Sequence, residues 1–334
     1  MRAREHAARL AILIVVAAAA LIPLTAWLRT PLVHARMAEA GGWGPDVLRA
    51  RVGEPLLVRL TSDDVVHGFA IGQSDAPAVD VLPGEISQTW LEFDQPGTYT
   101  FYCTRWCGVN HWRMRGTIEV EGGQAASAVL ASPPLFQVLG IDLDQPHPAE
   151  ATPSMPPDAQ RGLALAGRLA RPIVLSLDDY RAQSPAAVWQ KWRTDASLAG
   201  LSDQDLWDLV AYSYTSTLTS AERNEAAQLY AANCAACHGE RGDGQGVFAE
   251  ALAQNNLDLG GTSDTGHSAG PVRPADFTDA SSMLGASPTL LQGKILRGGM
   301  GTGMPMWGAI LTDQQTWTLA AFLYRFAFDM EPIS

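Results

Sequence analysis

The stretch FYCTRWCGVNHWRMRGTIEV, residues 101–120, carries four soft metal-binding side chains within one short segment. Apolar and aromatic residues at its start are typical of a strand, and the four side chains follow directly after it. They are Cys103, Cys107, His111 and Met114. Thiolates, thioethers and imidazoles are the ligands that copper prefers in proteins. The segment therefore predicts a copper site in a loop that follows a strand.

The number of cysteines in this loop distinguishes one copper ion from two. A single copper would need one thiolate, one downstream imidazole and one weak thioether, which leaves Cys103 without a role. A second thiolate four residues earlier lets both sulfurs bridge two copper ions, each completed by one imidazole and one weaker ligand. The second imidazole is expected from His67, in SDDVVHGFAI on an earlier strand. A disulfide between the two cysteines is the alternative in an oxidising compartment, but it gives the histidines and the methionine no role.

Residues 45–121 around this loop are predicted to form a compact all-β domain. Short apolar runs alternate with turn signals, a pattern typical of a sandwich or a cupredoxin-like Greek-key barrel. The runs are residues 56–60, 65–71, 86–93 and 98–102, and the turn signals are Gly53-Glu54-Pro55, Pro83-Gly84 and Gln95-Pro96-Gly97.

Three segments of this domain, VVHGFAI, VDVLPGE and YCTRWCGVNHWRMRGTIEV, resemble the copper domain of subunit II of haem-copper oxidases. The resemblance implies a binuclear CuA centre. Its ligands would be His67, Cys103, Cys107, His111, Met114 and the backbone carbonyl of Arg105. The position of Arg105 is commonly Glu in the oxidases, and Trp106 and Trp112 are also less usual there. Because the ligand would be a backbone oxygen, the side-chain change should not abolish copper binding, although it could alter the potential or docking.

A second metal signature occurs in NCAACHG, where Cys234, Cys237 and His238 form the Cys-x-x-Cys-His motif of covalent haem c attachment. The preceding NEAAQLYAAN predicts a short helix. The sixth iron ligand is expected from MGTGMPMWG, and we choose Met304 over Met300 and Met306, because its Gly-Met-Pro order resembles the methionine loop of class I cytochromes c. A His/Met pair suits electron transfer at a relatively high potential. A redox dithiol or a zinc pair would leave the histidine and this loop unexplained.

An internal repeat organises the second half of the chain. LSDQDLWDLVAYSY from Leu201 recurs as LTDQQTWTLAAFLY from Leu311, with half of the aligned positions identical, and RPIVLSLDDYRAQSP echoes RPADFTDASSMLGASP upstream. A Ser or Thr in each copy is a candidate N-cap. These matches predict two tandem copies of one all-α domain. Residues 158–218 would be a haemless cytochrome c-like repeat that serves packing or spacing, with a lone helical linker as the alternative, and residues 219–328 the cytochrome c domain.

The ends and connections of the chain complete the predicted multidomain layout. The run Leu10–Leu28 is uncharged and about as long as the roughly 20 residues of a membrane-spanning helix. Arg residues in the tail 1–9 favour a cytoplasmic amino terminus with everything after the span outside. A signal peptide cleaved near Ala40 is the alternative. Residues 122–157, rich in Ala, Pro, Ser and Gln, predict a linker.

The predicted role is that of an electron-transfer subunit, with no catalysis of its own. The net charge of −12 argues against nucleic-acid binding. The chain would pass electrons from a cytochrome c or a small copper protein, through haem c and CuA, to a haem-copper catalytic subunit in the membrane for oxygen reduction. A CuA subunit of a nitric oxide reductase and an independent membrane-anchored carrier are alternatives. His34 and His147 receive no role, and His267 is a surface-loop residue or an alternative ligand.

Overall fold

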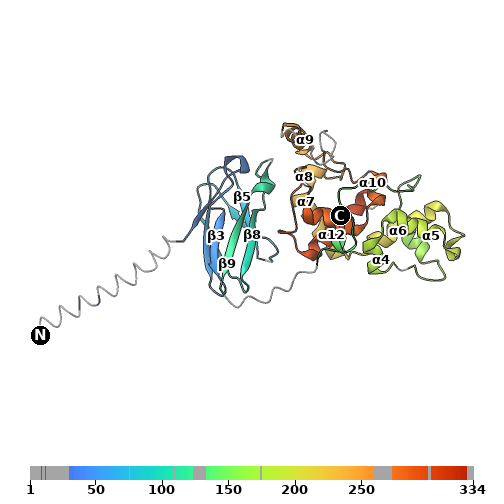
Figure 1. Ribbon diagram of the computed structural model, residues 1–334, viewed down its shortest axis with the longest axis horizontal. Helices are drawn as coiled ribbons and strands as arrows, with labels where there is room; N and C mark the ends of the chain where they lie inside the picture. Colours follow the sequence, from blue (N-terminus) through green and yellow to red (C-terminus); the bar gives the residue numbers. More distant parts are fainter. Residues whose placement is uncertain are drawn as a thin grey trace. The chain divides into compact units, whose positions relative to one another are not determined.

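A computed structural model describes residues 30–74, 76–108, 110–122, 133–173, 175–258, 273–299 and 302–328, together with Arg9 and Ile12. The chain divides into two compact units, one before residue 130 and one that contains residues 130–334 with 72–74 (Figure 1). Among the described residues, no helix is both long and apolar enough to cross a membrane. The predicted span 10–28 lies outside the described part of the chain except for Ile12.

The first unit consists of two sheets, which confirms the predicted all-β, cupredoxin-like fold (Figure 1). One sheet has the order β2-β1-β4-β7 and the other β3-β9-β8-β5-β6. Two strands, β1 and β2, lie before residue 45, where the predicted copper domain begins. The elements are β1 (Leu32–Ala35), η1 (Ala38–Ala40), β2 (Trp43–Gly44), β3 (Val47–Arg51), β4 (Leu56–Ser62), β5 (His67–Ile71), β6 (Val79–Val81), β7 (Ser87–Leu91), β8 (Gly97–Cys103), η2 (His111–Arg113) and β9 (Arg115–Glu121).

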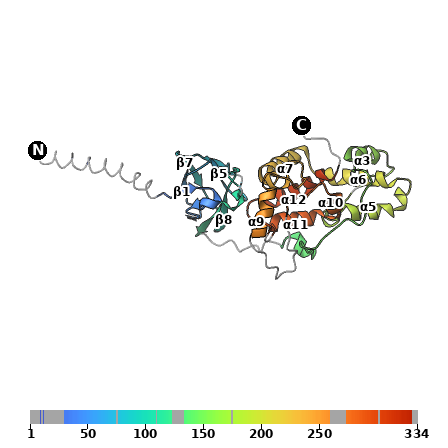
Figure 2. The ribbon, with the colours of Figure 1, turned by 90° about the horizontal axis from the view of Figure 1, so that it is seen from above.

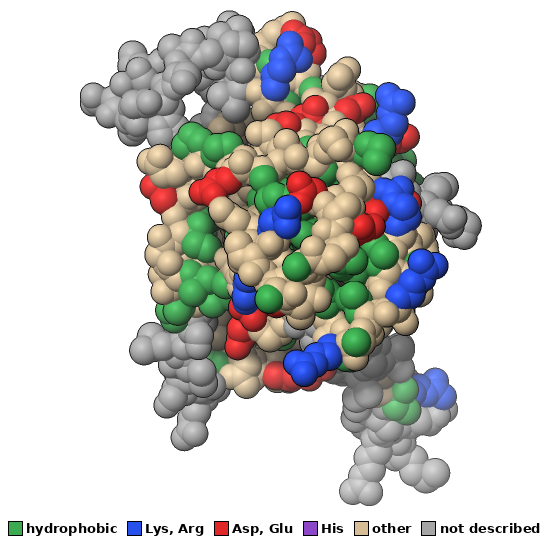
Figure 3. All heavy atoms as spheres, turned by 90° about the vertical axis from the view of Figure 1, so that its right-hand side faces the viewer, with side chains coloured by type: hydrophobic (Ala, Val, Ile, Leu, Met, Phe, Trp, Pro, Cys, Tyr) green, Lys and Arg blue, Asp and Glu red, His purple; other side chains and the backbone are tan. Residues whose placement is uncertain are grey.

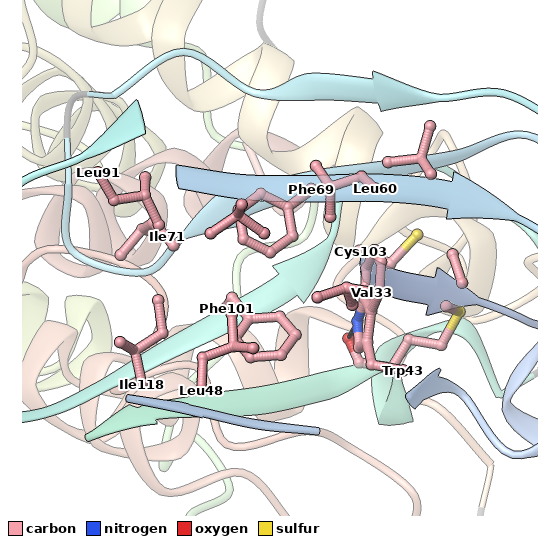
Figure 4. Close-up of a cluster of buried hydrophobic side chains, with 14 of the residues drawn as sticks. Val33, Trp43, Leu48, Leu60, Phe69, Ile71, Leu91, Phe101, Cys103 and Ile118 are labelled. Carbon is pink, nitrogen blue, oxygen red and sulfur yellow. Dashed lines mark hydrogen bonds between the residues drawn. The ribbon is translucent and has the colours of Figure 1, made fainter. Parts of the chain in front are cut away.

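Aromatic side chains fill the space between the two sheets (Figure 4). The ring centroids of Phe69 and Phe101 lie 5.3 Å apart, and Trp43 meets each ring edge-on at 5.7 Å. Burying one such side chain contributes about 1.5–3 kcal/mol. A Cβ atom at Gly116 would lie 2.1 Å from the Phe101 ring, so this position must be glycine. Cys103 belongs to the same buried cluster, so the predicted copper loop begins at a residue that is packed in the core.

The second unit is helical, as predicted for residues 158–328 (Figures 1 and 2). The N-caps expected in both copies are present, because Ser202 and Thr312 each form a capping box with the residue three positions later. The elements are α2 (Leu135–Val138), α3 (Ala159–Ala166), α4 (Leu177–Ala182), α5 (Pro185–Arg193), η3 (Ala196–Leu198), α6 (Asp203–Thr215), α7 (Ser220–Asn233), α8 (Ala235–His238), α9 (Ala249–Asp258), α10 (Ala280–Gly285), α11 (Pro288–Arg297), α12 (Asp313–Leu323) and η4 (Tyr324–Phe326).

The repeated helices pack against each other with approximate two-fold symmetry. Helices α4, α5 and α6 correspond in the repeat to α10, α11 and α12. Across the interface α4 contacts α11 while α5 contacts α10, and α6 contacts α12. The contact of α4 with α11 is thus the counterpart of the contact of α10 with α5. Such reciprocal contacts are expected where two equivalent surfaces face each other across a two-fold axis.

Two equivalent tyrosines meet at the centre of this interface. The rings of Tyr214 and Tyr324 lie edge to face, with 5.1 Å between centroids. The Tyr214 hydroxyl donates to the carbonyl of Gln183 at 2.7 Å, and the Tyr324 hydroxyl donates to the carbonyl of Ala286 at 2.6 Å. Gln183 and Ala286 occupy equivalent places, immediately before the Ser-Pro pair that begins α5 or α11. Equivalent tyrosines of the two copies therefore form equivalent hydrogen bonds.

The described part of the predicted linker, residues 133–157, lies on the helical unit. Helix α2 contacts α11, and the Ala149 amide donates to the carbonyl of Ser281 at 2.7 Å. Arg297 forms an ion pair with Asp144 at 2.6 Å. Composition alone did not indicate this packing, because Pro and Ala are equally common in extended linkers.

Charges of both signs occur together on one face of the molecule. On the face shown in Figure 3, acidic and basic side chains alternate with apolar ones. Ion pairs in the first copy join α5 to its neighbours, with Arg193 2.6 Å from Asp203 and Lys191 3.7 Å from Asp179. Such exposed pairs contribute little to folding, whereas Arg161 pairs at 2.6 Å with Asp208, which is buried.

Replacing either central tyrosine by phenylalanine is expected to destabilise the helical unit. Each change removes one hydroxyl and leaves a carbonyl without its donor, at a cost of about 1–3 kcal/mol. The cost should be larger for Tyr324→Phe, because Ala286 is almost fully buried. Chemical denaturation followed by circular dichroism measures it. Tyr99→Phe is the control, because its hydroxyl bonds Gln95 at the surface. An unchanged denaturation midpoint for either variant would show that the hydrogen bond of that tyrosine does not stabilise the helical unit.

Candidate copper and haem sites

Strand pairing brings His67 beside the copper loop. Strand β5 is antiparallel to β8, and Phe69 lies opposite Cys103 in the register. Alternate residues of a strand point to the same face, so His67, two positions before Phe69, shares the core-facing side with Phe69. The loop from Cys103 to η2 then returns His111 to the same end of the sandwich before β9 begins.

The two thiols lie together with one imidazole at each. The Cys103 and Cys107 sulfurs are 3.9 Å apart, well beyond the roughly 2.05 Å of a disulfide bond, and both cysteines are free. The Nδ1 atom of His67 is 3.7 Å from the Cys103 sulfur, and Nδ1 of His111 is 3.7 Å from the Cys107 sulfur. This arrangement is the one expected of two bridging sulfurs with a histidine on either side.

A weaker donor accompanies each thiol. The Arg105 carbonyl oxygen is 3.3 Å from the Cys103 sulfur, and the Met114 sulfur is 3.2 Å from the Cys107 sulfur. The structure thus brings all six residues predicted as copper ligands to one place. Two thiolates, two imidazoles, one thioether and one carbonyl form a donor set that suits copper, so the residues fit a paired copper centre.

The pKa values of the two thiols are shifted in opposite directions. A hydrogen bond from Cys107 lowers the pKa of Cys103, and the same bond together with burial raises the pKa of Cys107. Both protons must leave before two sulfurs can bridge.

Two further residues support these ligands and were missed from the sequence. Asp64 lies 2.7 Å from His67 Nε2, which leaves Nδ1 to face the thiols. Burial opposes ionisation of Asp64, but the hydrogen bond from His67 and two backbone N–H groups lower its pKa. Trp43 donates its indole N–H to the Met114 carbonyl at 3.0 Å. The Asp three residues before the histidine was a usable signal, whereas Trp43 lies outside the predicted domain.

The haem signature forms the short helix α8, directly after α7. Nδ1 of His238 lies 3.1 Å from the carbonyl of Ala275, and this hydrogen bond directs Nε2 away from the backbone. The imidazole is stacked on Phe277, with 4.7 Å between centroids and 18° between planes. Burial lowers the pKa of His238 and so favours the neutral imidazole that binds iron. Sequence reasoning missed Ala275 and Phe277 as partners of the histidine, because 37 residues separate Ala275 from it.

The two cysteines of this signature are free thiols in a buried setting. Burial raises the pKa of Cys234 to about 12 and that of Cys237 to about 11. They therefore remain protonated at neutral pH until they form thioether bonds. The residues present fit a covalently attached haem, with His238 as its proximal ligand.

The methionine loop follows α11 and is anchored to it, since the Trp307 amide donates to the Ile295 carbonyl at 3.1 Å. Met304 is partly buried, whereas Met306 is 54% exposed. Leu252 of α9 would lie 3.0 Å from a Cβ atom at Gly303, so the loop runs close to the helix that follows the signature. Met300 and His267 lie outside the described residues. His34 bonds Asp63, and Nδ1 of His147 lies 3.2 Å from the Gln145 carbonyl.

Loss of the Asp64 carboxylate is expected to weaken copper binding. Asp64→Asn removes the charge that orients His67, and partners of this kind change metal affinity by about 10- to 100-fold. Competition of the copper-loaded chain with a chelator measures the change. Asp63→Asn is the matched control, because Asp63 bonds Arg36 and His34 instead. Equal affinities for the two variants would show that Asp64 does not support the site.

Comparison with known proteins agrees with both sites. Residues 47–121 match the family described as cytochrome C oxidase subunit II, periplasmic domain, and residues 224–325 match cytochrome c. A cytochrome c oxidase subunit 2 of Thermus thermophilus is 38% identical over 85 residues, which are 25% of this chain and 62% of that protein. An alternative cytochrome c oxidase subunit 2 of Bradyrhizobium diazoefficiens is 34% identical over 74 residues, which are 22% of this chain and 26% of that protein.

A solved structure of the periplasmic domain of subunit II of cytochrome oxidase from Bradyrhizobium japonicum is 28% identical. It covers 22% of this chain and 53% of that chain, with a TM-score of 0.21. The chain spans less than two thirds of the length of each of these relatives. Residues 47–121 thus match the subunit II domain model and residues 224–325 the cytochrome c model, and these two matches imply a CuA centre and a haem c.

Proposed function

We propose that the chain is the electron-input subunit of a membrane haem-copper oxidase. Its cytochrome c domain would receive electrons from a donor, and its copper domain would deliver them to a catalytic subunit that reduces oxygen. The convergence of six copper-type donors in the first unit, in the same chain as a haem c signature, carries this proposal. Both implied centres exchange single electrons.

The closed donor set supports electron transfer rather than catalysis. Each thiol has one imidazole and one weaker donor beside it, all of them from the protein. A centre held in this way offers no open position to a substrate. We assign the copper ligands to His67, Cys103, Cys107, His111 and Met114 and to the carbonyl of Arg105. Oxygen chemistry would then belong to the partner subunit.

In the cytochrome c domain we assign haem attachment to Cys234 and Cys237 and the axial positions to His238 and Met304. The exposure of Met306 supports this choice, because a ligand of a buried iron must itself be shielded from water. The haemless repeat, residues 158–218, would serve as a packing partner of the haem domain. Its interface with α10–α12 supports that role.

We assign the chain to the cell membrane, with a single span at Leu10–Leu28 and the two units on the periplasmic side. The uncharged run and the arginines before it support this placement. The family description of residues 47–121 as a periplasmic domain agrees with it. Retention of the span would keep the copper domain next to a catalytic subunit in the bilayer.

Purification from native membranes is expected to recover the chain with a haem-copper catalytic subunit. Affinity capture of the tagged full-length chain from detergent extract, followed by haem analysis and mass spectrometry, identifies the partner. Oxygen and nitric oxide are then supplied to the complex separately, and oxygen should be the gas consumed. Turnover of nitric oxide alone would make the partner a nitric oxide reductase. Recovery of the chain from the soluble fraction, without such a subunit, would indicate an independent carrier.

A substitution at one metal site should change the spectrum of that site and leave the spectrum of the other site unchanged. Cys103→Ser removes one bridging sulfur, so the paired-copper optical and electron paramagnetic signals should be lost while the haem spectrum stays. His238→Ala removes the proximal ligand, so the haem spectrum should change while the copper signals stay. Both measurements use the full chain loaded with copper and haem. Two coupled coppers in Cys103→Ser would contradict the ligand assignment.

A further inference from the structure

Arg105 is tied to a neighbouring strand by three hydrogen bonds. Its Nε and Nη2 atoms donate to Oδ1 of Asp80 at 2.9 and 2.8 Å, and Nη2 also donates to Oδ2 at 2.9 Å. A guanidinium that engages a carboxylate through two nitrogens is held in orientation as well as in place. The carbonyl of the same arginine is 3.3 Å from the Cys103 sulfur. The side chain therefore restrains a residue whose backbone faces the thiols.

The partner of this arginine lies beside the strand that carries His67. Asp80 is on β6, opposite Gly68 in the register, and Gly68 follows His67 directly. The Thr104 amide donates to the Gly68 carbonyl at 3.1 Å. The loop therefore continues along β5 after β8 has ended, and Arg105 reaches across it to β6.

Glycine at position 68 is what permits this close approach. A Cβ atom there would lie 2.0 Å from the Thr104 hydroxyl and 3.2 Å from Cγ of Arg105. The backbone of β5 is thus covered by the two residues that follow Cys103. Loop, strand and ion pair form one continuous set of contacts around the copper donors.

We propose that Asp80 is a positioning residue for the copper centre. By holding Arg105, it fixes the loop that carries Cys103 and the Arg105 carbonyl against the strand that carries His67. This proposal rests on the copper ligand set given above. A glutamate at position 105, as is common in the oxidases that the loop resembles, would face Asp80 with a like charge, so Arg105 and Asp80 are a matched pair in this chain.

The effect should fall on the metal site and not on folding. Both partners are about half exposed, with side-chain exposures of 56% and 51%, and exposed ion pairs contribute little to global stability. Residues that orient metal ligands nevertheless change metal affinity by about 10- to 100-fold. Because this pair is reached by solvent, we expect the lower end of that range, about tenfold.

The test uses the full-length chain loaded with copper. Asp80→Ala is expected to release copper to a chelator about tenfold faster than the unaltered chain, and to change the copper hyperfine pattern in electron paramagnetic spectra. The thermal unfolding temperature of the copper-free chain should stay the same, because the ion pair itself is exposed. Glu119→Gln is the matched control, because Glu119 forms an exposed ion pair with Arg49 between β9 and β3. An Asp80→Ala variant that matches this control in both copper measurements would overturn the proposal.

A second experiment exchanges the charges of Arg105 and Asp80. Arg105→Glu keeps the backbone carbonyl but places two carboxylates together, so it should release copper at least as fast as Asp80→Ala. Adding Asp80→Lys to it should restore slow release, and failure to restore it would also overturn the proposal. If the unaltered chain binds no paired copper, the ligand set itself is wrong, a result distinguishable from loss of positioning alone.

Discussion

The register between β5 and β8 is the constraint on which the copper site depends. Because side chains alternate along a strand, a shift of one residue would turn His67 to the opposite face and leave the two thiols with one imidazole. The buried contact of Phe69 with Phe101 opposes such a shift, since it would expose a large aromatic ring. The hydrophobic core thus determines metal geometry. The donors come from strands 36 residues apart in sequence, and the sheet brings them within hydrogen-bonding range.

The parts of this molecule that sequence predicts well are those that depend on near neighbours. The Cys-x3-Cys-x3-His-x2-Met spacing fits one loop, and the helix caps at Ser202 and Thr312 follow from three-residue patterns. The contacts that orient the ligands depend on tertiary packing. Ala275 reaches His238 only after a long excursion of the chain, and Asp80 meets Arg105 only because β6 pairs with β5. Trp43 escaped notice because its strand has two residues, too few to show a period.

The two copies of the helical repeat differ in their connecting segments, and the haem signature lies in the second copy. Between α3 and α4 the first copy has ten residues, 167–176, whereas α7 and α10 are separated by residues 234–279, which include the signature. Likewise, residues 194–202 stand where the second copy has its methionine loop, 298–312. The helices that make the mutual interface are retained in both. The copies differ in the length of these two connecting segments, whereas two residues separate α4 from α5 and α10 from α11.

The pair Tyr214 and Tyr324 has a consequence for how the two copies can diverge. Each ring is part of the other's environment, so a substitution in either copy is felt by both. The face of α6 is therefore constrained by the copy that it contacts, whereas the connections 167–176 and 194–202 lie outside these helices. Half of the aligned positions are identical in the segments that begin at Leu201 and Leu311, and these segments form α6 and α12 and carry the two tyrosines. The two segments thus form one shared packing surface, and a change on either side alters the fit of both.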